Sequence, residues 1–249
     1  MDTSHPTEKL EGIARNLSRV TEKIALAAHS VGRAPDEVQL VVVSKLHSIE
    51  SIRAAIQGGA RKFGENYAEE GAAKIKEISS QGRLEWHMIG HIQSRKAHLV
   101  AYNFDLVHSV DSLKIAERLN AAREGNNRPL PVLLEINLSG EESKSGWQAQ
   151  NDSEWEGLLP EIVQVIAQAN LQVIGLMTMP PLSDNPEMAR PYFRQLVRCR
   201  DFLCARLRLP GTALKELSMG TSHDYEVAVQ EGATILRVGQ AILGPRPAR

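Results

Sequence analysis

The chain has 249 residues, and its 29 Lys and Arg against 30 Asp and Glu give a formal net charge of −1 at pH 7. This balance argues against a nucleic-acid partner, because phosphate contacts normally need an excess of clustered basic residues. The composition, 42% hydrophobic and 24% charged, is that of a globular protein and excludes the disordered and fibrous classes. No apolar run is long enough to cross a membrane and the N-terminus does not read as a signal peptide, so we expect a cytoplasmic protein without a membrane partner.

The first predicted element is a long amphipathic helix over residues 7–30. Its apolar residues recur at helical spacing: Leu10, Ile13, Leu17, Val20, Ile24 and Ala27. Eight short apolar runs follow, and we predict each as a strand: residues 39–44, 61–64, 84–89, 105–110, 132–138, 171–177, 214–219 and 234–238. Helices are predicted to begin between them near Ser48, Asn66, Ser94, Ser112, Ser153, Asn185 and Ser222. Ser153 and Glu156 have the spacing of a capping box.

Eight strands that alternate with helices over about 250 residues predict an α/β fold, a single (β/α)8 TIM-type barrel with an extra N-terminal helix. An open doubly wound sheet would usually carry a glycine-rich loop after its first strand, and the sequence VVVSKLHS at residues 41–48 has no glycine. We find no linker and no shift in composition. We therefore expect one domain over residues 1–249, in which residues 1–35 form a helix that packs on the barrel.

Lys45 follows the apolar run VVVS at the end of the first predicted strand, where TIM barrels place their functional residues. A lysine among apolar neighbours loses its proton more easily, and the neutral amine forms Schiff bases with aldehydes. Taken alone, Lys45 is better explained as a strand-end lysine that turns toward solvent.

Small residues after the seventh strand change this interpretation. The turn Ser218-Met219-Gly220-Thr221-Ser222 offers backbone N–H groups and hydroxyls to an anion, and Arg237 and Gly239 follow in the eighth strand. Phosphate sites recur after strands seven and eight of such barrels, and closure of the barrel brings strand eight beside Lys45. An amine for an aldehyde, a turn for a phosphate and a guanidinium for a ring nitrogen are the three requirements of pyridoxal 5'-phosphate. An arginine that stays charged would leave the pyridine nitrogen unprotonated.

The chain resembles the pyridoxal phosphate homeostasis protein family, single-domain relatives of the N-terminal barrel of alanine racemase. The resemblance runs from about residue 39 to the C-terminus and rests on VVVSK (41–45), FGENY (63–67), WHMIGHIQSRK (86–96), INLSGEESKSG (136–146), GLMTM (175–179), ELSMGTSHD (216–224) and RVGQAILG (237–244). It implies that Lys45 is the Schiff-base lysine and that Arg237 faces the pyridine nitrogen. It also implies a group of residues around the phosphate, Ser218, Gly220, Ser222, Gly239 and Gln240, and a group beside the cofactor, Asn66, Met177 and Met219.

Two residues depart from the pattern of the family. Thr221 stands where the family more often has methionine, and its hydroxyl could add a phosphate contact. Gln240 stands where a threonine or serine usually helps to hold the phosphate, and we expect its backbone N–H to make that contact.

Other polar residues carry weaker signals. His87 and His91 have a spacing that suits a metal pair on a helix, but Gly90 interrupts the segment and no third ligand follows, so we expect no metal site. Lys144 lies among Glu141, Glu142 and Ser143, which indicates a solvated ammonium group rather than a nucleophile.

The leading hypothesis is a protein that carries and buffers pyridoxal 5'-phosphate through a reversible Schiff base on Lys45, without catalytic residues or turnover. The resemblance implies this role, with apo-enzymes that require the cofactor as a candidate class of recipient and a monomeric state. A racemase of this class takes its second base from a β domain for which this chain has no residues. The alternatives are a cofactor-dependent amino-acid racemase, with water or Tyr67 as partner of Lys45, or a lyase. A third is an aldolase-like barrel whose Lys45 attacks a sugar phosphate.

Overall fold

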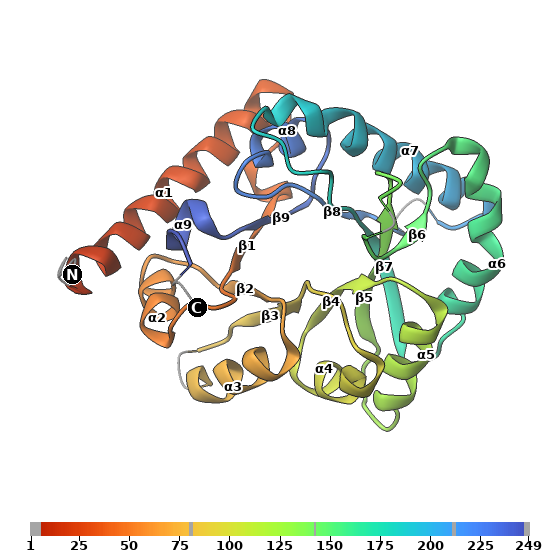
Figure 1. Ribbon diagram of the computed structural model, residues 1–249, viewed down its shortest axis with the longest axis horizontal. Coiled ribbons are helices and arrows are strands. Elements are labelled where there is room, and N and C mark those ends of the chain that lie inside the picture. The colour runs from red at the N-terminus through yellow and green to blue at the C-terminus, as the bar shows by residue number, and fades with distance from the viewer. Residues whose placement is uncertain (1–5, 80–81, 142, 211–212, 247–249) are drawn as a thin grey trace.

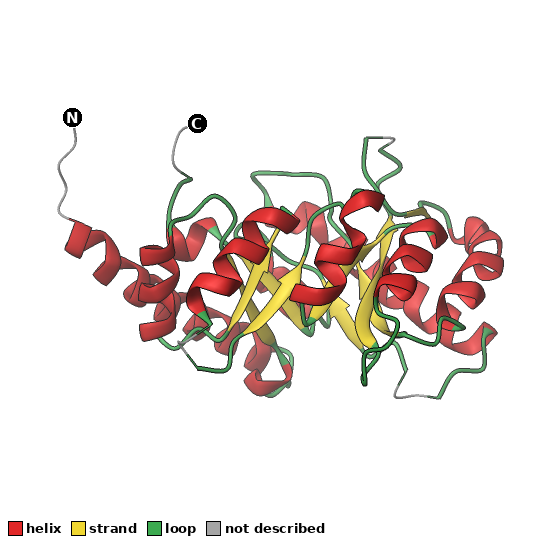
Figure 2. Ribbon diagram, turned by 90° about the horizontal axis from the view of Figure 1, so that it is seen from below, coloured by secondary structure: helices red, strands yellow, loops and turns green. Residues whose placement is uncertain are grey.

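A computed structural model describes residues 6–79, 82–141, 143–210 and 213–246, and it confirms the predicted barrel. Eight parallel strands pair in the order β4-β3-β2-β1-β9-β8-β7-β5, and pairing of β5 with β4 closes the ring. Helices surround these strands in both views (Figures 1 and 2). The strands are β1 Gln39–Val43, β2 Lys62–Glu65, β3 Glu85–Met88, β4 Leu106–Val110, β5 Leu130–Asn137, β7 Leu171–Met177, β8 Glu216–Ser218 and β9 Ile235–Val238.

In the described part of the chain, helices α1 to α8 follow the predicted order, and α9 was not predicted. They are α1 Pro6–Ser30, α2 Ile49–Gln57, α3 Ala68–Ile78, α4 Ala97–Asn103, α5 Leu113–Ala122, α6 Trp155–Ile166, α7 Arg190–Arg206, α8 Tyr225–Gln230 and α9 Gln240–Leu243. Short 3-10 turns are η1 Pro35–Glu37, η2 Ser94–Lys96, η3 Asp152–Glu154 and η4 Pro186–Ala189. The N-terminal helix α1 lies against α2, α8 and α9 (Figure 1). None of the helices in these ranges has the length and apolar character needed to cross a membrane.

Two local predictions were wrong and one short strand was not predicted, each for a physical reason. The capping box joins Asn151 and Glu154, two residues earlier than expected, because α6 is preceded by the turn η3. The strand expected from residue 214 begins at Glu216, since Leu214 has a φ of 50° and cannot extend a strand. The two-residue strand β6, Trp147–Gln148, pairs with the end of β5 and is too short to give a periodic signal.

The apolar core has two parts, which reflects the alternation of side chains along each strand. The larger part lies between the strands and the helices. The smaller part contains five buried residues, Val41, Leu106, Leu133, Met177 and Ile235. Along β9, Ile235 belongs to the smaller part and its neighbour Leu236 to the larger, so the smaller part fills the inside of the barrel. Buried polar side chains share that interior with it, and they bear on the candidate site.

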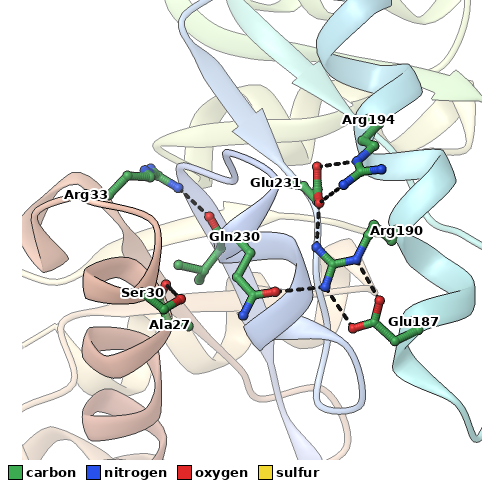
Figure 3. Close-up of polar contacts among 9 residues, drawn as sticks. Ala27, Ser30, Arg33, Glu187, Arg190, Arg194, Gln230 and Glu231 are labelled. Carbon is green, nitrogen blue, oxygen red and sulfur yellow. Dashed lines mark hydrogen bonds and ion pairs between the residues drawn. The ribbon is translucent and has the colours of Figure 1, made fainter.

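Polar contacts fix α8, the helix that follows the turn after β8, to its neighbours (Figure 3). Arg190 on α7 donates to Glu231 at the end of α8 and to Glu187 on η4. Arg33, after α1, donates through Nη1 to the carbonyl of Val229 at 2.7 Å. Ion pairs at a surface contribute little stability singly, but these contacts hold α8 from both sides.

Candidate functional site

A cavity of about 660 Å3 opens at the carboxyl ends of the barrel strands. Eight of the eleven residues singled out from the sequence line it: Lys45, Asn66, Met177, Thr221, Ser222, Arg237, Gly239 and Gln240. They follow or end β1, β2, β7, β8 and β9, so closure of the barrel brings together residues that are far apart in the chain.

The other three predicted residues, Ser218, Met219 and Gly220, are buried and are not part of the cavity wall. The Ser218 hydroxyl contacts Arg237 and His108 inside the barrel. Met219 packs in the core between strands and helices. Gly220 has a φ of +93°, and a Cβ there would lie 2.5 Å from the Cβ of Ala228, so glycine allows the tight turn that leads to the wall.

The backbone on both sides of Lys45 is tied to helix α3. Lys74 donates from Nζ to the carbonyl of Ser44 at 2.7 Å and to Glu70 Oε1 at 2.6 Å. The same Glu70 oxygen accepts the N–H of Leu46 at 2.6 Å, and Leu46 has a φ of 63°. A non-glycine residue with positive φ is uncommon and needs support from its surroundings, which these contacts supply. They fix the point from which Lys45 leaves β1.

Glu65 completes this cluster from β2. Its Oε1 accepts from the Ser44 hydroxyl at 2.7 Å and from Lys74 Nζ at 2.9 Å, and its side chain is fully buried. Burial raises the pKa of Glu65, and the charge of Lys74 opposes that shift. Sequence reasoning did not find this cluster, because Lys74 is a member of an exposed-looking charged helix and nothing in its spacing marks it as buried.

The amine of Lys45 is easier to deprotonate than an ordinary lysine. Burial lowers its pKa first, and the positive charge of Arg246 lowers it further, while Glu65 and Glu70 act in the opposite direction. A neutral amine is the nucleophile in Schiff-base formation, so the environment favours the chemistry expected for this residue.

Ser222 joins the turn after β8 to the turn after β9. Its Oγ accepts from the backbone N–H groups of Gly239 and Ala241, each at 3.2 Å. A serine hydroxyl has two acceptor lone pairs and one hydrogen, so with both lone pairs used Ser222 keeps its O–H as a donor. Since Ser222 lines the cavity, that donor is available to an anion bound there.

Unlike Ser222, Thr221 has no hydrogen-bond donor left for a ligand. Its hydroxyl donates to Asp224 Oδ1 at 3.0 Å, and its backbone N–H donates to the same oxygen at 2.6 Å. Both donors of Thr221 are thus occupied within the turn. The additional phosphate contact considered for this hydroxyl is not available in this arrangement.

Arg237 reaches the cavity from inside the barrel and is 3% exposed. Its Nη1 donates to Ser218 Oγ at 2.5 Å and its Nη2 to the carbonyl of Thr178 at 2.9 Å. Burial lowers its pKa to about 10, so the guanidinium keeps its charge at neutral pH. A guanidinium has five N–H donors, which leaves others for a ligand. Across the cavity wall, Asn66 Oδ1 is a buried oxygen without a hydrogen-bond partner among the described residues.

The two histidines of the H-x3-H pattern do not converge. His87 is fully buried inside the barrel, whereas His91 is exposed and bonds Asp111 Oδ2 through Nδ1 at 2.8 Å. Across the described ranges no three histidine, cysteine or acidic side chains are grouped so that they could hold a metal ion.

Comparison with known proteins gives a consistent result. The family model of the alanine racemase N-terminal domain matches residues 15–247. The pyridoxal phosphate homeostasis protein of Escherichia coli strain K12 is 41% identical over 240 residues, which are 95% of this chain and 98% of that protein. The protein of the same name from Vibrio alginolyticus is 38% identical over 241 residues, or 95% and 99% of the two chains.

Solved structures agree with the sequence comparison. The structure of PipY from Synechococcus elongatus PCC7942 with pyridoxal phosphate bound has a TM-score of 0.79 and 34% identity, and the match covers 93% of this chain and all of PipY. Alanine racemase from Corynebacterium glutamicum matches with a TM-score of 0.65 and 20% identity, over 96% of this chain and 62% of that enzyme. The second likeness shows the fold alone.

Proposed function

The chain belongs to the alanine racemase N-terminal domain family and, within it, to the pyridoxal phosphate homeostasis proteins, and on that premise we propose that Lys45 holds the cofactor as a reversible Schiff base. The protein binds pyridoxal 5'-phosphate and acts in its homeostasis rather than as an enzyme. The observation that carries the residue assignment is the cavity that gathers Lys45, Ser222 and Arg237 at one end of the barrel.

The donors in the wall fit the phosphate of this cofactor. Ser222 has its O–H free to donate, because its lone pairs are taken by Gly239 and Ala241. We assign the phosphate to the hydroxyl of Ser222 and to the backbone N–H of Gln240, both of which line the cavity. Gly239 lines the cavity beside them, and its N–H donates to Ser222 and so holds that hydroxyl in place. Gly220 shapes the turn that presents Ser222.

Arg237 fits the ring nitrogen. A guanidinium that stays charged donates a hydrogen bond but does not give up its proton, so a pyridine nitrogen facing it remains unprotonated. The bound cofactor supplies an aldehyde and an electron-withdrawing ring, and an unprotonated ring is a weak electron sink. Arg237 therefore favours carriage over turnover. Met177 and Asn66 complete the wall around the ring, and Ser218 contributes through its bond to Arg237.

We propose that residues 1–249 form a single domain that acts as a cytoplasmic monomer and hands the cofactor to apo-enzymes that require it. Tyr67, the residue considered as a second base for a racemase, is 45% exposed and is not part of the cavity wall. That placement supports a carrier over the racemase alternative.

An absorbance spectrum before and after borohydride, followed by peptide mapping, tests the assignment. We expect a visible band that reduction removes, with the pyridoxyl group on Lys45. Lys45→Ala should abolish the reducible adduct, whereas Lys76→Ala, a change at an exposed lysine of α3, should leave it intact. A pyridoxyl group on another lysine would overturn the assignment to Lys45. A protein that does not bind the added cofactor, and on which borohydride traps no adduct, would overturn the proposed function.

A further inference from the structure

A continuous chain of hydrogen bonds runs through the barrel interior from the cavity to the opposite end of the strands. Arg237 Nη1 lies 2.5 Å from Ser218 Oγ, which lies 2.7 Å from His108 Nδ1. His108 Nε2 lies 2.8 Å from His87 Nδ1, and His87 Nε2 lies 2.8 Å from Glu85 Oε1. Four strands supply these residues, β9, β8, β4 and, for the last two, β3. The interior of a TIM barrel is usually filled with branched apolar side chains, so such a chain calls for an explanation.

Because these side chains are buried, each hydrogen bond between them affects stability and orientation. Ser218, His87 and His108 are fully buried, and Arg237 is 3% exposed. A buried polar group without a partner is costly, whereas a fully satisfied network fixes its members in one arrangement. Here each of the three inner side chains, Ser218, His108 and His87, has a partner on both sides.

The carboxylate of Glu85 determines where the hydrogens lie. Its hydrogen bond from His87 is the main cause that lowers its pKa to about 2, and Lys62 contributes, so Glu85 is ionised at neutral pH and only accepts. His87 must then donate from Nε2. If each ring carries a single proton, each has one donor and one acceptor, and His87 Nδ1 then accepts from His108 Nε2. Burial holds the pKa of His108 well below its ordinary value, in keeping with a neutral ring.

The direction of these hydrogen bonds also determines how Ser218 meets Arg237. Because His108 donates from Nε2, its Nδ1 is an acceptor, and the hydroxyl of Ser218 must donate to it. The hydrogen of Ser218 therefore points away from Arg237, and a lone pair of its oxygen faces Nη1. With Nη2 bound to the Thr178 carbonyl, two edges of a planar and rigid guanidinium are fixed. The direction in which its remaining donors enter the cavity is then fixed as well.

We propose that His108, and His87 through it, are positioning residues that orient Arg237 toward the ring nitrogen of the bound cofactor. The ligand in this statement rests on the proposed function, whereas the direction of the hydrogen-bond chain is a property of the free protein. Neither histidine touches the cofactor. Without an acceptor at His108 Nδ1, the Ser218 hydrogen is free to turn toward the guanidinium, and the bond that holds Nη1 weakens.

Nitrogen-15 NMR of the free protein at pH 8 tests the chain directly. We expect both His87 and His108 to be neutral and to carry their single proton on Nε2, with His108→Asn used to assign the resonances. A proton on Nδ1 of either ring, or a doubly protonated His87, would overturn the inference. This measurement uses the unmodified protein and needs no cofactor, so its outcome is independent of the proposed function.

Two substitutions at one position test the positioning role. His108→Asn and His108→Phe both remove the donor to His87, but only asparagine keeps an acceptor near the Nδ1 position. The readout is the pH midpoint of the absorbance change of the bound cofactor. We expect His108→Phe to lower this midpoint by about one pH unit, the size of one hydrogen bond to a charged group. When Arg237 is no longer held toward the ring nitrogen, that nitrogen can gain a proton, and a positively charged ring disfavours a second positive charge on the Schiff base.

The matched variants separate positioning from packing. The midpoint of His108→Asn should stay close to that of the wild type, and His98→Phe, a change at an exposed histidine of α4, should not move it. Equal shifts in the asparagine and phenylalanine variants, or no shift in either, would refute the role of His108. A wild-type protein without a cofactor band would instead refute the proposed function and leave the NMR result to decide the chain. If His108→Phe does not fold, the NMR result likewise decides.

Discussion

Replacing Lys74 by methionine removes the cation on which the backbone around Lys45 depends. The Lys74 side chain is 8% exposed, and its ammonium group donates to Ser44 O, Glu65 Oε1 and Glu70 Oε1 at 2.6 to 2.9 Å. Methionine has a similar length but no charge. The substitution therefore leaves the fully buried carboxylate of Glu65 without its cationic partner and frees the carbonyl of Ser44.

The expected loss of unfolding free energy is about 3–5 kcal/mol, the range for removing one partner of a buried ion pair. The loss should depend on pH through Glu65, whose pKa is raised by burial even with Lys74 present. Between the unfolded and folded pKa values of Glu65 the folded state binds more protons, so stability falls as pH rises. Without Lys74 the folded pKa rises further. The penalty should therefore be larger at pH 8 than at pH 5, where Glu65 can take up a proton.

Urea unfolding at both pH values measures this loss, with Lys76→Met on the exposed face of the same helix as the matched control. The control should change stability by less than about 0.5 kcal/mol, as surface substitutions usually do. At pH 8 Lys74→Met should also retain less cofactor, because Leu46 and Ser44 lose their common anchor. A loss of unfolding free energy below about 1 kcal/mol, typical of an exposed ion pair, would refute the view that Lys74 and Glu65 form a buried ion pair. A loss that does not depend on pH would refute it as well.

Three further substitutions probe the cavity wall. Ser222→Ala should weaken cofactor binding about tenfold or more in an absorbance titration, because it removes a donor to a charged group and leaves two N–H groups unpaired; unchanged affinity would contradict its role. Thr221→Met should alter affinity by less than about threefold, the effect of a weak contact, since the hydroxyl already donates to Asp224; a large loss would show that Thr221 reorients toward the ligand. Glu135, which lines the cavity, has its pKa raised to about 7, first by burial and then by Asp111. Glu135→Gln should therefore stabilise the protein at pH 8 by up to about 3 kcal/mol and leave it unchanged at pH 4, and equal effects in thermal unfolding at both pH values would refute this.

The strands were predictable because a buried parallel strand is an apolar run, and the convergence of Lys45 and Arg237 on one cavity was predictable because barrel closure has a fixed geometry. Lys45 and Arg237 are far apart in the sequence, yet β1 and β9 pair directly, with Val41 opposite Arg237. The geometry of the turn after β8 was harder to predict from the sequence. That Ser222 would bond the start of α9 rather than cap α8 depends on how two loops approach each other, and no local spacing encodes that approach.

The hydrogen-bonded residues inside the barrel could be predicted only in part, because they come from several strands. Glu85 and His87 are two residues apart, so alternation along β3 places both side chains on the same face. Two polar residues facing the inside of a barrel are a signal that sequence analysis could have used. Their link to His108 could not be inferred, because the height at which β3 and β4 face each other follows from the stagger of the closed sheet: His87 pairs with Leu106, one layer below His108.

The site is held from both faces of the sheet, which bears on how the cofactor is exchanged. Outside the barrel, Lys74 fixes the backbone on which Lys45 stands, and inside it Ser218 and Thr178 fix Arg237. Elsewhere in the cavity wall, Leu182 is 85% exposed and Met179 is 50% exposed. On the proposed function, we expect an incoming amine to approach from the side of the β7–η4 loop, away from both anchors. We accordingly expect exchange of the cofactor to leave the barrel closed, so that hydrogen exchange in β1 and β9 should be equally slow with and without an acceptor amine.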